Sequence, residues 1–333
     1  MQIENNAPIY IGGPDRCGKT TLAAFLSSHP RIAIPVIGSN FWSYFYGQFG
    51  DLSKEENFER CLDAMLHYKH ALFLQPDPDR IRKEFWQGTP CYARLFALFH
   101  VHFAEAAGKS RWGDQTGLIE RYADGIIASY PEVKMLHMIR DPRDRYEASL
   151  AMWPDGKGRA GVAAARWLYS ASLAMHNQKK YPLQYKVIRF ETMVERPVET
   201  LQEVCEFLGE DYTPQMLLME NAPGHRAKLQ PEVPENRPVA LSTDFIGQYK
   251  NHVPKEEIAF LQTSLHQQML FFGYKKDKVR FTPKEKLKYS FSTFPVNQAR
   301  MRSWLVRERL QHSFPAQIGR RPSRSMLIPQ KSS

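Results

Sequence analysis

The sequence lacks long apolar runs. No stretch approaches the roughly 18 consecutive apolar residues that a membrane-spanning helix needs. The first eight residues, Met-Gln-Ile-Glu-Asn-Asn-Ala-Pro, carry neither the basic start nor the apolar segment of a secretory signal peptide. The hydrophobic content of 43% and charged content of 24% are typical of globular proteins. We therefore expect a cytoplasmic protein with a sizeable core.

Cysteine is scarce and scattered. The chain has four cysteines, Cys17, Cys61, Cys91 and Cys205. No C-x-x-C pair and no cluster of Cys and His occurs at metal-ligand spacing, which argues against a disulfide framework and a structural zinc site. Two close pairs remain, His67 with His70 and His100 with His102. Because a metal site needs three or four convergent ligands, we expect no bound metal.

Net positive charge is missing from most of the chain, although the formal net charge of the whole is +10. Residues 275–333 hold 15 Lys and Arg against 3 acidic residues, whereas residues 1–274 hold 30 basic and 32 acidic residues. The basic character therefore belongs to the tail. A nucleic-acid-binding core is not indicated.

One stretch near the start has the pattern of a phosphate-binding loop. The apolar run of residues 8–11 predicts a buried strand, and the spacing Leu22, Phe25, Leu26 predicts a helix. Between them, Gly13-x4-Gly18-Lys19-Thr20 fits the Walker A spacing. Glycines let backbone N–H groups approach an anion, and a helix N-terminus adds the positive end of its dipole. We expect residues 13–21 to cradle a phosphate group.

Strands and helices alternate along the chain, which predicts an α/β fold with a parallel β-sheet flanked by helices. The expected strands cover residues 8–11, 31–38, 110–117, 133–139 and 185–190. The expected helices cover residues 40–49, most of 54–108, and 118–130, 143–152, 161–180, 197–208 and 255–272. We place one domain at 1–274 and a basic extension at 275–333. The aromatic stretch 40–49 suits either a core-facing helix or the wall of an acceptor pocket.

Two interpretations of the phosphate loop remain open at this point. A P-loop kinase or NTPase would use Lys19 on the phosphates of ATP and Thr20 on Mg²⁺, and would need an acidic residue after a second strand. The strand 133–139 runs instead into Arg140-Asp141-Pro142-Arg143, and Glu191 after the last strand is the nearest substitute. Arg140 favours the other interpretation, a second anion site on the same sheet edge, which suits a nucleotide with both 5′ and 3′ phosphates.

The ordered motifs resemble the PAPS-dependent sulfotransferases, in their bacterial and tyrosylprotein-like branch. The resemblance covers about residues 8–274. It rests on the loop 12–20, on Ser27-Ser28-His29-Pro30 and on Trp112-Gly113-Asp114-Gln115-Thr116. It continues with Met138-Ile139-Arg140-Asp141-Pro142-Arg143, Phe207-Leu208-Gly209, Ile246-Gly247-Gln248-Tyr249 and Phe272-Gly273-Tyr274. It implies a P-loop-type sulfotransferase fold with PAPS (3′-phosphoadenylyl sulfate) as sulfuryl donor.

The resemblance also implies roles for single residues. Arg16 matches the loop residue that contacts the transferring sulfuryl group, and Gly18 and Thr20 match phosphate-binding positions. Lys19 stands where the family usually has Thr. Arg140 and Ser149 match the 3′-phosphate ligands, nine residues apart where eight is usual. The predicted donor-binding set is Gly13, Arg16, Cys17, Gly18, Lys19, Thr20, Thr21, Arg140 and Ser149.

The predicted catalytic set is Arg16, which the resemblance implies, together with Lys19 and Asp114. Arg16 and Lys19 would stabilise the charge that develops during transfer. A general base must take the acceptor proton, and Asp114 is the first candidate, ahead of Glu120 and His29. Asp114 also suits the N-cap of the following helix. Cys17 is either an inert small residue or, in an electropositive loop, an oxidisable thiol.

The prediction is therefore a sulfotransferase that moves a sulfuryl group from PAPS to a hydroxyl acceptor: a carbohydrate, another metabolite or a peptide. The alternatives are an ATP- and Mg²⁺-dependent P-loop kinase or NTPase and a non-catalytic nucleotide-binding protein. Residues 39–108, 153–160 and 210–240 would build the acceptor pocket. In the tail, an amphipathic helix over about 296–311 either docks on the domain or binds a membrane surface or an acidic partner. The oligomeric state cannot be read from the sequence.

Overall fold

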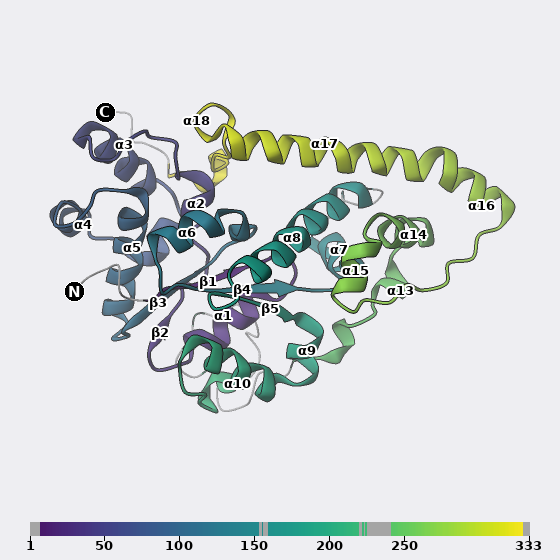
Figure 1. Ribbon diagram of the computed structural model, residues 1–333, viewed down its shortest axis with the longest axis horizontal. Coiled ribbons are helices and arrows are strands. Elements are labelled where there is room, and N and C mark those ends of the chain that lie inside the picture. The colour runs from purple at the N-terminus through teal and green to yellow at the C-terminus, as the bar shows by residue number, and fades with distance from the viewer. Residues whose placement is uncertain are drawn as a thin grey trace.

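A five-stranded parallel sheet forms the centre of the molecule (Figure 1). The computed structural model describes residues 7–152, 155, 159–219, 222, 224 and 241–328. In spatial order the strands are β2 Ile32–Ala33, β3 Arg111–Gln115, β1 Ile9–Gly12, β4 Lys134–Ile139 and β5 Tyr185–Arg189. Every neighbouring pair is parallel. The predicted α/β class is confirmed, and the carboxyl ends of the strands share one edge, where ligands of such sheets bind.

Helices cover both faces of this sheet. They are α1 Lys19–Ser27, α2 Phe41–Tyr44, α3 Glu55–Leu66, α4 Pro78–Phe85, α5 Tyr92–Ala106, α6 Ala123–Ser129, α7 Pro142–Met152, α8 Ala160–Lys180, α9 Phe190–Glu195, α10 Pro197–Leu208, α11 Gln215–Leu218, α13 Tyr249–His252, α14 Lys255–Ser264, α15 His266–Phe271, α16 Pro283–Lys288, α17 Phe294–Ser313 and α18 Pro315–Ile318. Short 3₁₀ turns cover Ala71–Leu74 (η2), Ile119–Tyr122 (η3), Thr243–Phe245 (η5) and Arg324–Met326 (η7), and a π-helical turn, η6, covers Tyr289–Thr293.

Alternation along the strands assigns each helix to a face. In β1, Ile9 and Ile11 pack with α1, α9 and α10 on one side. Tyr10 points to the other side, where it accepts a hydrogen bond from the Trp42 indole (3.0 Å) and packs with α2, α5 and α6. Figure 1 shows α6 and α8 above the strands and α1 and α10 below them. Because helices cover both faces of the sheet, all four residues of β1 are buried. This explains why the strand is a continuous apolar run in the sequence.

Two predicted elements are shorter than expected. The strand predicted over 31–38 is confirmed only at Ile32 and Ala33. Pro35 has no N–H to donate to a ladder, and the Gln115 side chain donates to the carbonyl oxygens of residues 35 and 36 instead. The aromatic helix predicted over 40–49 is confined to α2. Its rings nevertheless face the core, because Phe41, Trp42 and Phe45 are almost fully buried.

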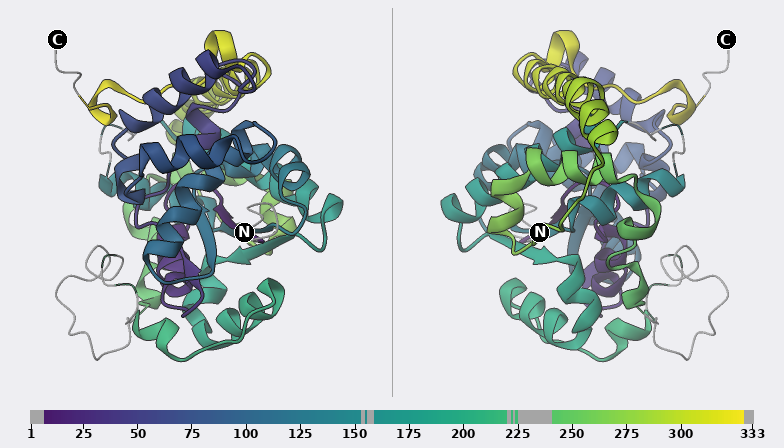
Figure 2. Two further views of the ribbon diagram at one scale, coloured as in Figure 1. Left: turned by 90° about the vertical axis from the view of Figure 1, so that its left-hand side faces the viewer. Right: turned by 90° about the vertical axis from the view of Figure 1, so that its right-hand side faces the viewer.

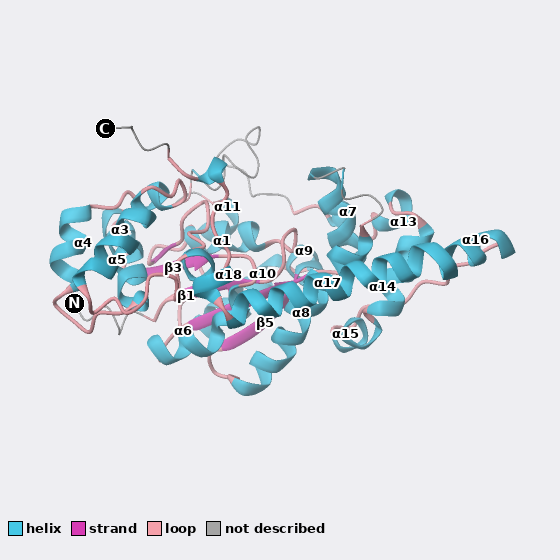
Figure 3. Ribbon diagram, turned by 90° about the horizontal axis from the view of Figure 1, so that it is seen from above, coloured by secondary structure: helices cyan, strands magenta, loops and turns pink. Residues whose placement is uncertain are grey.

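The tail packs along the outside of the domain. Helix α17 lies against α8, as Figures 1 and 3 show from two directions. Asn297 Oδ1 accepts a hydrogen bond from the Gly161 amide (2.8 Å), and Glu308 forms a buried ion pair with Arg121. Further on, the amide of Lys69 donates to the carbonyl of Met326 (2.9 Å). The docking alternative for the tail helix is therefore confirmed.

Among the helices that the structure describes, none is both long and apolar enough to cross a membrane.

Candidate active site

The turn from β1 to α1, residues 13–20, is the phosphate-loop candidate and is called the loop below. Gly13 and Gly18 have φ values of 110° and 88°. A β-carbon at Gly13 would lie 2.1 Å from the Met138 carbonyl oxygen, and one at Gly18 would lie 2.6 Å from the Phe190 ring. Only glycine suits these two positions. Arg16 also has a left-handed φ, 63°, which is an uncommon conformation for a residue other than glycine.

Three basic side chains bind four consecutive carbonyl oxygens of the loop. The Lys19 ammonium donates to the carbonyls of residues 13 (2.9 Å) and 14 (2.5 Å). Arg145 Nε, from α7, donates to the carbonyl of residue 15 (3.1 Å). Arg140 Nη1, from the end of β4, donates to the carbonyl of residue 16 (3.2 Å). These contacts fix the direction of each peptide plane in the loop.

The loop consequently has N–H groups to spare. In a trans peptide the N–H points opposite to the carbonyl, so the N–H groups of residues 15, 16 and 17 point away from the basic side chains. In the part of the chain that the structure describes, no residue accepts a hydrogen bond from them. The nine-residue helix α1 begins directly afterwards, without a side-chain cap and without an acidic residue in its first turn. Free donors and the positive end of a helix dipole together form an anion site.

Asp15 is the one acidic residue in the loop, and two arginines neutralise it. Its carboxylate lies 2.7 Å from Arg145 Nη2 and 3.1 Å from Arg166 Nη2 of α8. Burial opposes the charge, but Arg145 and then Arg166 outweigh that effect and hold the pKa of Asp15 below its usual range. Burial, in turn, lowers the pKa of Lys19. The sequence alone gave no reason to select Arg145 or Arg166.

Arg140 links the loop to the segment around residue 245. Its Nη2 donates to the Phe245 carbonyl (2.6 Å), and its guanidinium lies 4.5 Å from the centre of the Phe190 ring. The Trp167 indole holds the backbone carbonyl of Arg140 (2.8 Å). The Nε of the Arg140 guanidinium is buried, and no described residue bonds to it. A buried cation with a spare donor beside the loop suits a second anionic group.

Ser149 lies on α7 in a cleft of about 280 Å³ that borders the loop at Asp15. Its hydroxyl donates to the carbonyl of Tyr146 one turn earlier (2.7 Å). Arg159 and Arg166 also line this cleft, and the Nε of Arg166 is buried without a described partner. Arg140 is not among the lining residues, so the structure gives the two predicted 3′-phosphate ligands different surroundings.

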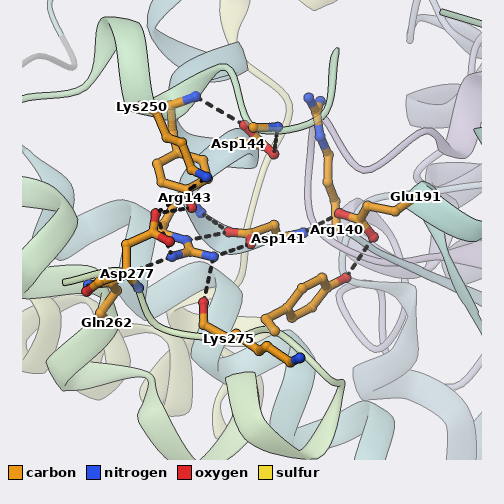
Figure 4. A network of polar contacts seen from close by, with 12 residues as sticks. Arg140, Asp141, Arg143, Asp144, Glu191, Lys250, Gln262, Lys275 and Asp277 are labelled. Atoms are coloured by element: carbon orange, nitrogen blue, oxygen red, sulfur yellow. Dashed lines mark hydrogen bonds and ion pairs between the residues drawn. The ribbon is translucent and has the colours of Figure 1, made fainter. Parts of the chain in front are cut away.

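The residues that follow Arg140 hold neighbouring segments together (Figure 4). Arg143 binds both oxygens of Asp141 (2.9 and 2.6 Å). The Asp141 amide donates to Glu191 (2.8 Å), whose other oxygen accepts from the Tyr274 hydroxyl (3.0 Å). Burial raises the pKa of Glu191. The carboxylates that a P-loop NTPase could have offered to Mg²⁺ are therefore bonded to protein groups.

One further carboxylate of this network, Asp144, fixes the start of α13. Its oxygens accept from the amides of Gly247 (2.7 Å) and Tyr249 (3.1 Å). Burial raises the pKa of Asp144. Because Phe245 lies just before this anchor, Asp144 also holds the segment that Arg140 contacts.

Asp114 is buried inside β3. Its oxygens accept from the Ser39 amide (2.9 Å), the Ser39 hydroxyl (2.6 Å) and the Thr116 hydroxyl (3.0 Å). Burial opposes its charge, but His100 and these hydrogen bonds outweigh it and lower the pKa of Asp114. These are the contacts of an anchor for the chain after β2. The alternative role of Asp114 as N-cap of the following helix is wrong. The helical turn η3 begins at Ile119, and the residue at its N-cap position is Leu118. The role of Asp114 as general base stays a prediction.

Glu120 lies beneath the loop. Its carboxylate accepts from the Gly13 amide (3.0 Å) and from the Ser170 hydroxyl, which lies 3.3 Å from His137 Nε2. Sequence reasoning ranked Glu120 only as a minor base candidate. The contact with Gly13 spans 107 positions, and no local pattern announces it.

The remaining predictions concern Cys17 and the histidines. Burial raises the pKa of the Cys17 thiol to about 11, which opposes the oxidisable-thiol hypothesis. His29 bonds to the Asp211 carbonyl (3.0 Å). His102 bonds to Glu84 and His100 to the Phe96 carbonyl, so that pair does not converge. Among the described residues, no group of three or more His, Cys, Asp or Glu could hold a metal ion.

The expected acceptor loops 153–160 and 210–240 lie largely outside the described residues.

Comparison with known proteins agrees with this geometry. The profile of the sulfotransferase family matches residues 8–214, which include the loop, β4 and Arg140. The chain belongs to the sulfotransferase family. No curated protein sequence was found to match it.

Solved structures similar to this sulfotransferase include two sulfotransferase domains. One comes from the olefin synthase of Synechococcus PCC 7002, with 18% identity, a TM-score of 0.56, and coverage of 82% of this chain and 96% of that domain. The other comes from the curacin biosynthetic pathway, with 16% identity, a TM-score of 0.53, and coverage of 82% and 99%. At these identities the likeness shows the α/β sulfotransferase fold.

Proposed function

We propose that this sulfotransferase takes PAPS as its donor and moves the sulfuryl group to a hydroxyl acceptor, either a small molecule or a glycan or peptide. The observation that carries the proposal is the set of carbonyl contacts in the loop. Because Lys19, Arg145 and Arg140 occupy the carbonyl side, three successive N–H groups face the other side, where no described residue accepts from them. This arrangement suits the 5′-phosphosulfate end of PAPS.

Donor binding would use both ends of the nucleotide. The 5′ end would lie on Gly13, Arg16, Cys17, Gly18, Lys19, Thr20 and Thr21, and the 3′-phosphate on Arg140 and Ser149. The side chain of Arg16 is exposed and no described residue binds its guanidinium, so it could reach the sulfuryl group. The spare Nε of Arg140 supports a 3′-phosphate there.

Sulfuryl transfer by in-line displacement builds negative charge on the bridging and equatorial oxygens. Arg16 and the N–H groups of the loop would stabilise that charge, as preorganised donors do in other group transfers. Lys19 would add to this effect only after its ammonium leaves the carbonyl oxygens of residues 13 and 14, which hold it on the other side of the loop. The proposal needs no metal. Asp114 stays the candidate base, and its hydrogen bonds to Ser39 and Thr116 would have to open before it could meet an acceptor hydroxyl.

Thermal unfolding with added nucleotide tests this proposal. We expect adenosine 3′,5′-bisphosphate (PAP) at saturating concentration to raise the midpoint by about 5 °C, because it binds only the folded state. ATP–Mg²⁺ and GTP–Mg²⁺ should raise it less. Arg16→Ala should reduce the PAP shift, whereas Arg31→Ala, an exposed arginine away from the loop, should not. Stabilisation by ATP–Mg²⁺ alone would overturn the proposal in favour of a kinase or NTPase.

Transfer itself is measured with sulfur-labelled PAPS and a broad panel of hydroxyl acceptors. We expect label on at least one acceptor and its loss in Arg16→Ala. PAP binding without turnover on any acceptor would favour a non-catalytic nucleotide-binding protein.

A further inference from the structure

Helix α17 carries a second apolar stripe on the side that faces away from α8. Its inner side is occupied, since Asn297, Met301 and Glu308 are buried. Val296, Val306 and Leu310 are 46%, 60% and 45% exposed. At 3.6 residues per turn these three side chains fall within about 80° of one another, opposite to the buried side. The helix is therefore apolar outward as well as inward.

Arginines flank this stripe on both sides. Arg302 and Arg309, one heptad apart, lie along one border, and Arg300 and Arg307 lie along the other. All four are exposed. The apolar stripe thus runs between two rows of guanidinium groups.

The segments before and after α17 add further exposed apolar and basic side chains. Before α17, Leu287 and Phe291 are 62% and 79% exposed, and after it Phe314 and Ile318 are 52% and 47% exposed. Lys284, Lys286 and Lys288 of α16 are exposed as well. We call the exposed residues of 284–318 the outer face. It holds seven of the seventeen large exposed apolar side chains of the described residues.

The outer face offers no free carboxylate. Within residues 284–318 the only acidic residues are Glu285 and Glu308. Glu285 pairs with Lys255 (2.7 Å), and Glu308 is 2% exposed between Arg121 and Arg320. Exposed basic side chains therefore outnumber exposed carboxylates on the outer face.

We propose that the outer face docks on an anionic lipid surface. Apolar side chains flanked by basic ones suit the interface, where the apolar stripe enters the boundary with the acyl chains and the cations meet lipid phosphates. The 20 residues of α17 make a rod about 30 Å long. Figures 1 and 2 show it along the upper edge of the molecule, above the sheet and α8, with α3 and α18 at about the same height. A symmetric contact between the outer faces of two copies would instead place basic side chains against basic side chains.

Co-sedimentation of the full chain with vesicles tests the proposal. We expect binding to vesicles of equal parts phosphatidylcholine and phosphatidylserine at low salt, little binding to phosphatidylcholine alone, and weakening at high salt. The triple variant Arg302→Gln, Arg307→Gln, Arg309→Gln should bind at least about tenfold more weakly, because each basic residue contributes to attraction by the surface. The double variant Phe291→Ser, Val306→Ser should also bind more weakly at unchanged charge.

Matched controls change the same chemistry elsewhere on the exposed surface. Lys54→Gln, Lys83→Gln, Lys179→Gln removes three charges, and Leu183→Ser, Leu270→Ser removes two exposed apolar groups. Both should bind vesicles nearly as well as the unmodified chain. Equal losses in controls and test variants would overturn the proposal. So would absence of binding to anionic vesicles at low salt, binding only to an acidic polypeptide such as polyglutamate, or a dimer that the outer-face variants dissociate.

Discussion

Single residues in the loop show how positive charge shapes a backbone. Lys19 reaches back along its own loop, whereas Arg145 reaches in from α7. Both bind carbonyl oxygens, whose partial negative charge would otherwise repel an anion. Lys19 therefore has a structural explanation that does not depend on ATP. The Walker A spacing that it completes is compatible with a different nucleotide.

Replacement of Arg145 tests the importance of these contacts. We predict that Arg145→Met lowers the free energy of unfolding near neutral pH by about 2 to 3 kcal/mol, because Arg145 is 2% exposed and binds both the carboxylate and the carbonyl of Asp15. The pKa of Asp15 is lower in the folded protein, so the pair stabilises the fold above the ordinary carboxyl pKa of about 3.9 and loses its effect as the pH falls below it. The difference in free energy of unfolding between Arg145→Met and the unmodified chain should therefore shrink as the pH falls.

The surface pair Arg82–Glu59 provides the matched control. Both side chains are 41% exposed, so Arg82→Met should cost less than about 1 kcal/mol. Chemical unfolding at several pH values measures both variants. An Arg145→Met effect no larger than that of Arg82→Met would show that the loop does not need this arginine.

Sequence reasoning identified the residues that act through local spacing. Gly13, Gly18 and Lys19 belong to one short motif, and the structure places them together in the loop. It did not identify Arg145 or Arg166, because 130 residues separate Asp15 from Arg145 and an arginine inside a helix carries no mark of its partner. The surroundings of Asp114 were equally hidden, since Ser39 comes from a different part of the chain.

At the scale of elements, the contact between α8 and α17 determines where the tail lies. The two helices approach so closely that a β-carbon on Gly161 would lie 2.1 Å from the Asn297 carbonyl oxygen. Neither helix end can shift without losing the hydrogen bond between these two residues.

A methyl group at this crossing tests the contact. We predict that Gly161→Ala lowers the free energy of unfolding by about 1 to 3 kcal/mol through overpacking. Gly125→Ala in α6 is the matched control, because a β-carbon there meets its nearest neighbours at an ordinary 3.6 Å. That change should stabilise the protein slightly, since alanine favours helix. Thermal or denaturant unfolding measures the stability of both variants. Equal effects of the two substitutions would contradict the close approach of α8 and α17.

Elements were predictable where local signals stood at both ends. Residues 197–208 were expected as a helix and form α10 with those bounds, because Pro197 suits the first turn and Gly209 ends it with a φ of 71°. β2 was overestimated because the apolar residues after Ala33 looked like a strand while Pro35 prevented one. The helix expected over 255–272 is divided at Leu265 into α14 and α15.

At the scale of the whole molecule, the parallel sheet brings the loop and Arg140 together across more than 100 residues. β1 and β4 are neighbours, so the residues that follow them meet at one edge. The sequence predicted this meeting from the alternation of strands and helices alone. The path of the tail was not predictable in the same way, because its apolar and basic residues allowed both docking on the domain and a surface role.

Calorimetric titration with PAP and with adenosine 5′-monophosphate tests the central claim that two anion sites hold one nucleotide. The two ligands differ only in the 3′-phosphate. We predict that PAP binds at least about tenfold more tightly, since an arginine–phosphate contact contributes about 1.5 to 3 kcal/mol. Arg140→Lys should narrow that difference, and Arg31→Lys should leave it unchanged. Equal affinity for the two nucleotides in the unmodified chain would contradict the account.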